Sequence, residues 1–417
     1  LNEYKDMTSS NILARFLLAF LSLAIVLPAF AAHEPYPLKY WALRDVVSNV
    51  RISPDGNYLA LMKIPTRDAN PVIEIYDTSD FEKKPFVFNA DPMEITSFYW
   101  VGDQDMIVRF RQRVRDKIDG FNQGVYETKL ALLDVKEESV EQFRETNPSV
   151  VNLLPNKPNK VILSFNPGGA DRLSKVDRAF RPRSYYEFDL EKGTKKLLMQ
   201  GKLSMGQVQF NGEGEPWTAR GFDRGKDEYV WYIKRPVEDA KWEEIFRLHE
   251  DSFENFSIEG IDEAKPDTIF VRAHNGRDKQ ALWEFDVNTK TFGEMIYARA
   301  DVNVAGVRYH SNAWTNPDTV VAVAYRTDKT HFEYFDAVEG ATYAQLEGII
   351  PHAHNLRITS RSRDGSVLTI YNVGPHDPGS YYLIKGGRLK AIGSTQPLLK
   401  SEDLADVKYI SYPARDG

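Results

Sequence analysis

The sequence predicts an all-β fold, a seven-bladed β-propeller, and three observations support this prediction. After residue 45 the chain consists mainly of short runs with alternating apolar and polar residues, such as 320–325, separated by turn signals. Long stretches with the 3.6-residue period of a helix are scarce. The runs also recur at intervals close to 50 residues, with two pairs of strands in each interval.

One recurring piece is an apolar-aromatic strand that ends in Asp, followed by a turn and a second strand. Copies lie at 72–88, 130–143, 185–198, 230–248, 281–297 and 381–392, with a looser copy at 331–346. The aligned positions lie 47 to 57 residues apart: Asp77, Asp134, Asp189, Pro236, Asp286, Asp336 and Lys385. Because an Asp side chain accepts hydrogen bonds from the backbone of a tight turn, we interpret these as turn residues and not as catalytic residues.

A second recurring piece precedes the first and consists of a strand, a turn rich in Pro, Asp, Asn and Gly, and another strand. Its copies lie at 50–63, 97–110, 152–165, 260–273 and 358–371. Together the two pieces form a four-stranded unit that cannot cover both of its faces alone, so copies stack around an axis. Seven copies fit between residues 46 and 397. A tandem of β-sandwiches would not explain such similar intervals.

Within the first 32 residues, the part that follows Asp6 has the pattern of a secretory signal peptide. Arg15 precedes the apolar run 16–30, and Ala29-Phe30-Ala31 fits a small-x-small cleavage site. The uncharged run, 16–32, is shorter than the roughly 20 residues that span a bilayer. An uncleaved membrane anchor is the alternative. We expect translation to start at Met7, and we expect an exported protein, periplasmic or secreted from a bacterium, with no stable membrane association after cleavage.

Composition excludes several classes of function. The net charge is −7 and the pI is near 5.7, which argues against broad nucleic-acid binding, because phosphates require a basic face. The chain has no cysteine, so disulfides, thiolate metal sites and a cysteine nucleophile are excluded.

Two segments resemble the prolyl oligopeptidase family of serine peptidases. ISPDGNYLAL, residues 52–61, resembles the turn that opens a blade in that family's propellers. SEDLADVKYISYPARDG, residues 401–417, resembles the junction where a strand, here Lys408 to Tyr412, and a turn at Asp416-Gly417 open the α/β-hydrolase domain. The resemblance is closest to the secreted bacterial acylaminoacyl-peptidase or dipeptidyl-peptidase branch. It implies three parts: 1–32 as signal peptide and upstream residues, 33–400 as propeller, and 401–417 as the start of a truncated hydrolase domain.

The resemblance implies that the catalytic residues lie in the hydrolase domain. There the Ser lies on a G-x-S-x-G elbow, and the Asp and then the His follow it in the chain. The sequence contains no G-x-S-x-G, so we assign no catalytic, cofactor-binding or metal-binding residue. The expected role of the propeller is to gate access to a peptidase that acts on short peptides. A free-standing periplasmic propeller that binds proteins or peptides as a scaffold is the alternative. A third possibility is an enzyme with its active site inside the propeller channel. The sequence does not support it, because it shows no convergent acid/base pair. Oligomerisation through exposed blade edges stays open.

Four arginines, Arg109, Arg111, Arg113 and Arg115, alternate on one predicted strand face. They could line a channel and attract peptide carboxylates. We favour the alternative that they lie on a solvated hairpin extending from blade two, where charge protects an exposed edge.

Four further groups receive structural interpretations. His352 and His354 lack a third metal ligand nearby, and we place them in a loop between blades six and seven. Glu243 and Glu244 are adjacent on a blade-four strand, unlike the glutamate pair of dipeptidyl peptidases. Residues 166–169 form a Gly-rich turn without the Lys-Ser/Thr of a phosphate loop. Four tryptophans are expected on strands between blades: Trp100, Trp231, Trp283 and Trp314.

Overall fold

A computed structural model describes residues 35–116, 120, 124–166, 182–202, 204–235, 237, 239–262, 265 and 267–415. The chain divides into two units, Leu1–Ala42 and Leu43–Gly417. In the first unit the described residues include one short helix, α2 (Leu38–Trp41), without buried residues. The predicted signal peptide lies outside the described residues. No helix in the described part of the chain is long and apolar enough to cross a bilayer.

The second unit consists of seven antiparallel sheets, each built from consecutive strands. Blade one consists of β1 (Val47–Ile52), β2 (Tyr58–Lys63), β3 (Val72–Asp77) and β4 (Phe86–Phe88). Blade two consists of β5 (Glu94–Trp100), β6 (Asp105–Arg115), β7 (Val125–Asp134) and β8 (Ser139–Gln142). Blade three consists of β9 (Ser149–Asn152), β10 (Lys160–Phe165), β11 (Ser184–Asp189) and β12 (Thr194–Met199). Blade four consists of β13 (Gln207–Phe210), β14 (Pro216–Asp223), β15 (Glu228–Ile233) and β16 (Glu243–His249). Blade five consists of β17 (Phe256–Ile261), β18 (Thr268–Ala273), β19 (Ala281–Asp286) and β20 (Thr291–Tyr297). Blade six consists of β21 (Val304–Tyr309), β22 (Val320–Arg326) and β23 (Thr330–Tyr334), followed by helix α4 (Ala337–Ile349). Blade seven consists of β24 (Arg357–Arg361), β25 (Val367–Gly374), β26 (Asp377–Lys385) and β27 (Arg388–Ser394).

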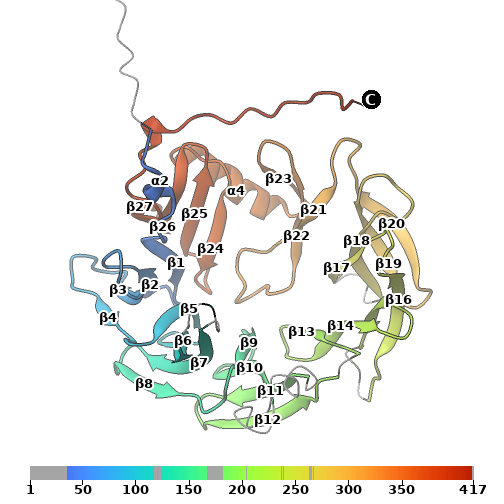
Figure 1. Cartoon of the computed structure of the whole chain (residues 1–417), viewed down its shortest axis with the longest axis horizontal. Helices are drawn as coiled ribbons and strands as arrows, with labels where there is room; N and C mark the ends of the chain where they lie inside the picture. Colours follow the sequence, from blue (N-terminus) through green and yellow to red (C-terminus); the bar gives the residue numbers. More distant parts are fainter. Residues whose placement is uncertain are drawn as a thin grey trace, which may run out of the picture. The chain divides into compact units, whose positions relative to one another are not determined.

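The seven sheets stand in a ring, which confirms the predicted seven-bladed propeller (Figure 1). In the six four-stranded blades the first strand lies nearest the middle of the ring and the last strand lies at the outside (Figure 1). The predicted strand pairs agree with the observed ones in six blades, since alternating apolar residues and turn signals are local features of the sequence.

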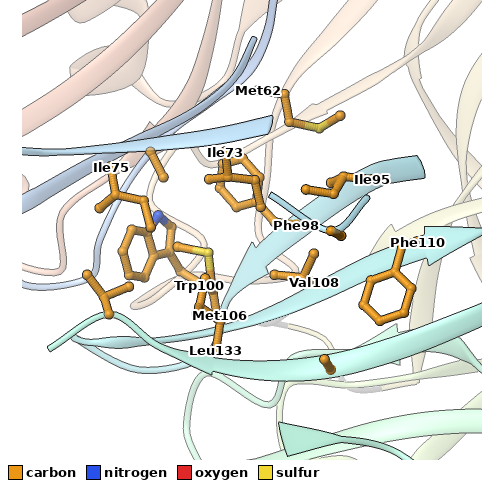
Figure 2. Packing of buried hydrophobic residues seen from close by; sticks show 14 residues of the cluster. Met62, Ile73, Ile75, Ile95, Phe98, Trp100, Met106, Val108, Phe110 and Leu133 are labelled. Atoms are coloured by element: carbon orange, nitrogen blue, oxygen red, sulfur yellow. The ribbon is translucent and has the colours of Figure 1, made fainter. Parts of the chain in front are cut away.

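The hydrophobic core is divided among the contacts between neighbouring blades. Seven buried clusters are found in the described residues, and each joins two blades that are adjacent in the ring. Figure 2 shows the cluster between blades one and two, where Ile73 and Ile75 of β3 face Phe98, Trp100 and Met106 of blade two. A single blade therefore has no core of its own, as the repeat predicts.

Blade six differs from the prediction. We expected a strand, a turn and a second strand over 331–346, but the sheet has three strands, and helix α4 follows Asp336. The Asp336 side chain caps the helix by accepting hydrogen bonds from the backbone N–H groups of Val338 and Glu339. Tyr343 and Leu346 then bury one face of the helix in the cluster shared with blade seven. In chain order the helix therefore stands where the other six blades have their fourth strand.

The strand-ending Asp residues act in turns, as predicted. Oδ1 of Asp134 accepts hydrogen bonds from the backbone N–H groups of Lys136 and Glu137, and Oδ1 of Asp286 does the same for Asn288 and Thr289. These bonds replace the backbone partners that a tight turn leaves unsatisfied. The position aligned at Pro236 lies outside the described residues.

The ends of the ring meet without exchanging a strand, because blades one and seven each consist of their own four strands. They are joined by the cluster that contains Val50, Leu59, Tyr381 and Leu383. The Oγ1 of Thr359 also donates to the carbonyl oxygen of Val50 at 2.9 Å. Side-chain packing and a few hydrogen bonds therefore close the ring.

The segment after blade seven does not match its prediction. The short 3₁₀ helix η2 (Ser401–Asp403) is followed by residues without strand pairing, and Lys408 to Tyr412 are exposed. The predicted strand over these residues is not formed, since no strand in the described part of the chain pairs with them. Asp416 and Gly417, the predicted turn, lie outside the described residues.

Candidate functional site: the centre of the ring

The seven innermost strands surround a centre that has two different faces. Because each sheet is an antiparallel meander, the turn between its first and second strands lies on one face, and the first strand starts on the other. We call the first the turn face; it carries the turns at 53–57, 211–215 and 362–366 and the loop at 310–319. The second is the junction face, where the N–H of Val46 donates to the carbonyl oxygen of Thr395 at 2.8 Å.

The β21–β22 loop, residues 310–319, crosses the centre on the turn face. Asn312 is 5% exposed, and its Nδ2 donates to the carbonyl oxygens of Ser362 and Arg363 in blade seven, both at 3.1 Å. Asp318 accepts from the N–H of Gly212 in blade four at 2.9 Å. Between these anchors, Trp314 packs against the cluster of blades one and two. The loop therefore contacts opposite sides of the ring and covers this mouth.

A buried ion pair fixes the start of the loop. Glu339 of α4 is 1% exposed, and its Oε1 accepts from Nη1 of Arg361 at 3.2 Å and from Oγ of Ser311 at 2.9 Å. Its Oε2 accepts from the backbone N–H of Ser311 at 3.2 Å. The carboxylate thus joins the helix, the loop and blade seven.

Beside the loop, the centre contains a cavity of about 490 Å³ lined by blades three to six. Its wall combines apolar residues with Trp217, Tyr309, Glu259 and Asp318. The hydroxyl of Tyr309 donates to the carbonyl oxygen of Glu259 at 2.8 Å, and burial raises the pKa of Tyr309 to about 12. Tyr309 is therefore a hydrogen-bond donor at neutral pH. A cavity with this volume and mixed lining is large enough for a short stretch of peptide.

A second cavity, of about 320 Å³, lies between blades four and five. Its residues include Gln207 at the start of β13 and Ser257 near the start of β17, so it lies toward the junction face. Arg220 and Arg272 contribute its positive charge. The loop covers the turn face, whereas this cavity lies at the opposite end of the inner strands.

Comparison with known proteins gives a structural likeness and no sequence match. No family model and no curated protein matches the chain. Among solved structures, a prolyl endopeptidase shares the fold at a TM-score of 0.53, with 13% identity over 94% of this chain and 55% of that chain. Prolyl oligopeptidase B from Galerina marginata, bound to a 35mer substrate, also gives 0.53, with 10% identity over 86% of this chain and 52% of that one.

The chain shares the fold of one part of a prolyl oligopeptidase. It spans about half the length of these structures. An acylaminoacyl peptidase from Pyrococcus horikoshii matches at a TM-score of 0.42, with 15% identity over 81% of this chain and 50% of that chain.

Three of the four arginines lie where we expected them, on a solvated hairpin of blade two, whereas Arg109 is half-buried. The hairpin is formed by β6 and β7, and Arg111, Arg113 and Arg115 are exposed at its far end. Arg111 pairs with Glu94, and Arg113 donates to the hydroxyl of Tyr126. None of the five described cavities is lined by these three arginines.

The other candidate residues are placed apart from the centre. Glu243 and Glu244 start β16 in blade four, and both oxygens of Glu244 accept from Arg247. His352 and His354 lie in the loop between α4 and β24, as predicted. No group of three or more metal-ligating side chains is found in the residues that the structure describes. Of residues 166–169, which we predicted to form a Gly-rich turn, only Asn166 is described.

The tryptophan prediction was wrong for one residue. Trp100, Trp231 and Trp283 lie on strands and pack between blades, but Trp314 lies on the turn that forms the centre of the β21–β22 loop. The sequence contained a signal for this loop, since 310–319 is longer than the corresponding turn at 362–366. Sequence reasoning missed both the loop and Arg220.

Proposed function

We propose that this chain is the propeller part of a serine peptidase of the prolyl oligopeptidase family that acts on short peptides. The observation that supports the proposal most strongly is the shared fold over 94% of this chain and about half of a prolyl endopeptidase. The catalytic Ser, Asp and His would belong to a hydrolase domain outside this chain, since the sequence has no G-x-S-x-G. The propeller would limit which substrates reach that domain.

The geometry of the centre supports a gating role. The β21–β22 loop lies across the turn face through contacts of Asn312, Trp314 and Asp318, and in this proposal it restricts entry from that face. A peptide would therefore reach the central cavity of about 490 Å³ from the junction face. In this arrangement a folded protein is too large to enter, whereas a short extended peptide fits.

Two measurements test the peptidase proposal. The isolated chain should not hydrolyse acyl-aminoacyl or prolyl chromogenic substrates, whereas the protein from the complete reading frame should hydrolyse them and react with a fluorophosphonate. Hydrolysis by the isolated chain that a fluorophosphonate abolishes would contradict the proposal.

A free-standing propeller that binds peptides or proteins as a scaffold is the second candidate. It is favoured by the ring itself, because all seven described interfaces between blades are made within this chain. A reading frame without a hydrolase domain would support the scaffold and exclude the peptidase.

We also propose that the protein is exported. The support is the basic flank, apolar run and small-residue site within residues 7–32. Fusion of these residues to a periplasmic reporter should give reporter activity and cleavage near Ala31. Retention of the fusion in the cytoplasm would contradict export, and an uncleaved membrane-bound fusion would support the anchor alternative.

A further inference from the structure

Arg220 of β14 is a half-buried arginine without a polar partner. Its side chain forms no hydrogen bond or ion pair with any described residue, and its Nε is buried without an acceptor. The guanidinium carbon lies 4.2 Å from the ring centroid of Tyr229 and 5.2 Å from that of Trp231. These rings hold the planar group in place but leave its donors unused.

The charge of Arg220 is not compensated by the rest of the cavity. Its neighbour Arg272 is already paired, because Nε donates to Glu259 at 2.8 Å and Nη1 donates to Gln280 at 2.7 Å. The remaining polar side chains of the wall are neutral: Gln207, Gln209, Thr218, Asn255 and Ser257. The cavity of about 320 Å³ therefore contains one free positive charge among the described residues.

The position of the cavity also suits a ligand that comes from the junction face. Arg220 lies opposite Gln207 in the β13–β14 ladder, and Arg272 lies opposite Ser257 in the β17–β18 ladder. Both pairs are at the junction-face end of inner strands. The β21–β22 loop lies on the other face, so it leaves the centre accessible from this side.

A buried donor without an acceptor destabilises a folded protein, because the donor has lost its hydrogen bonds to water. A ligand that supplies the acceptor would remove this destabilisation. A guanidinium presents a planar fork of donors that matches a carboxylate in a bidentate manner. Since only one arginine is free, a singly charged carboxylate suits the cavity better than a phosphate group, which carries more charge.

We propose that the cavity between blades four and five binds the carboxylate of a peptide through Arg220. The neutral amides of Gln207 and Asn255 can pair with the peptide groups beside it. The inference rests on the proposed function in that it assigns a substrate subsite, selective for an acidic group, to the propeller. The carboxylate can come from the C-terminus of a peptide or from an Asp or Glu side chain.

Calorimetric titration of the 417-residue chain with two pairs of peptides tests the proposal. One pair is Ala-Ala-Ala with a free or an amidated C-terminus, and the other is acetyl-Ala-Glu-Ala-amide against acetyl-Ala-Gln-Ala-amide. In at least one pair the peptide with the carboxylate should bind about 10- to 100-fold more tightly, as expected for a hydrogen bond between charged groups. The pair that shows the difference identifies the source of the carboxylate.

Variants assign the effect to Arg220. R220Q should remove the preference for the carboxylate, whereas R220K should retain part of it. R299Q is the matched control, because Arg299 also stacks over a tyrosine, Tyr325, at 4.1 Å but is already paired with Asp301. It should bind like the unchanged chain. N255D leaves the stacking of Arg220 intact and should weaken carboxylate binding by repulsion, so it covers the case in which R220Q does not fold.

Equal binding within both peptide pairs, or an unchanged preference in a folded R220Q or in N255D, would overturn the inference. That result would leave the peptidase proposal standing, because binding is measured without catalysis. Conversely, a reading frame without a hydrolase domain would overturn the peptidase proposal, while a preference lost in R220Q would still establish the site.

Discussion

Glu339 and Arg361 form an ion pair between helix α4 and blade seven, with Oε1 and Nη1 3.2 Å apart. Glu339 is 1% exposed and the Arg361 side chain is 20% exposed. The same carboxylate accepts two hydrogen bonds from Ser311, the second residue of the β21–β22 loop. The pair therefore connects the helix that replaces a strand with the loop that covers the channel.

Replacement of Glu339 by Gln should destabilise the protein strongly. The change keeps the shape of the side chain but leaves Arg361 without its counter-charge, so we expect the free energy of unfolding to fall by about 2–4 kcal/mol. Chemical denaturation measures this change. E333Q, at the exposed position of β23, is the control and should lie within about 0.5 kcal/mol of the unchanged protein. An equal effect of both variants would show that the buried pair is not stabilising.

The helix in blade six can be tested by a cavity-forming substitution. Leu346 is 3% exposed in the cluster shared with blade seven, so L346A should lower the free energy of unfolding by about 2–4 kcal/mol. Ile349 on the same helix is 51% exposed, and I349A should have a much smaller effect. Similar losses for the two variants would indicate that α4 does not pack on blade seven through Leu346.

The prediction of the fold succeeded where the relevant interactions are local. Asp286 was recognised as a turn residue because its partners, Asn288 and Thr289, follow it directly. The same Asp signal was misleading at Asp336, where good helix formers follow, and Tyr343 and Leu346 have helical spacing. There the recurring strand pattern was given more weight than the helix cap.

The candidate site could not be predicted in this way. That Arg220 has no partner depends on residues from four strands, among them Gln207, Tyr229 and Arg272. No spacing in the sequence brings these residues together. The covering role of the β21–β22 loop likewise depends on contacts with blades four and seven, which only the closed ring creates.

The anchoring of the β21–β22 loop should be visible in limited proteolysis. Asn312 donates to two carbonyl oxygens of blade seven, so N312A should detach the loop and increase cleavage by proteinase K within 311–318 severalfold. N316A is the control, because the Nδ2 of Asn316 bonds only within the loop, to Thr315. Unchanged cleavage of N312A would mean that Asn312 does not hold the loop.

The segment after blade seven should be attached in a pH-dependent manner. The Nδ1 of His376 lies 3.2 Å from the carbonyl oxygen of Ser401, and its Nε2 lies 2.7 Å from Oδ1 of Asp406. The Ser401 carbonyl and then the Asp406 carboxylate raise the pKa of His376 above its usual value. A raised pKa in the folded state means that the stabilisation is complete below about pH 6.5 and is lost as the pH rises through the folded-state pKa. His352, with its ring centroid 5.7 Å from that of His376, is the neighbouring titratable group.

Hydrogen exchange of residues 401–406 measures this attachment. Exchange should be slower at pH 5.5 than at pH 8 after correction for the intrinsic rate, and H376N should remove the difference. H249N, at an exposed histidine of β16, should leave it unchanged. A pH dependence that persists in H376N would exclude His376 as its origin.

Gly56 offers a test of the contact that closes the ring. It lies in the first turn of blade one with φ +76°, and a Cβ there would lie 3.0 Å from Cγ2 of Val367 in blade seven. Gly193 is the matched control, since it also has a positive φ, +62°, but a Cβ there would have no neighbour within 4 Å. Both alanine variants incur the backbone strain of a left-handed residue, about 1–2 kcal/mol. Only G56A should also push blades one and seven apart, so its melting temperature should fall further than that of G193A. Equal shifts in melting temperature would mean that the interface accommodates the added methyl group without a loss of stability. Close packing at this turn would then not help to close the ring.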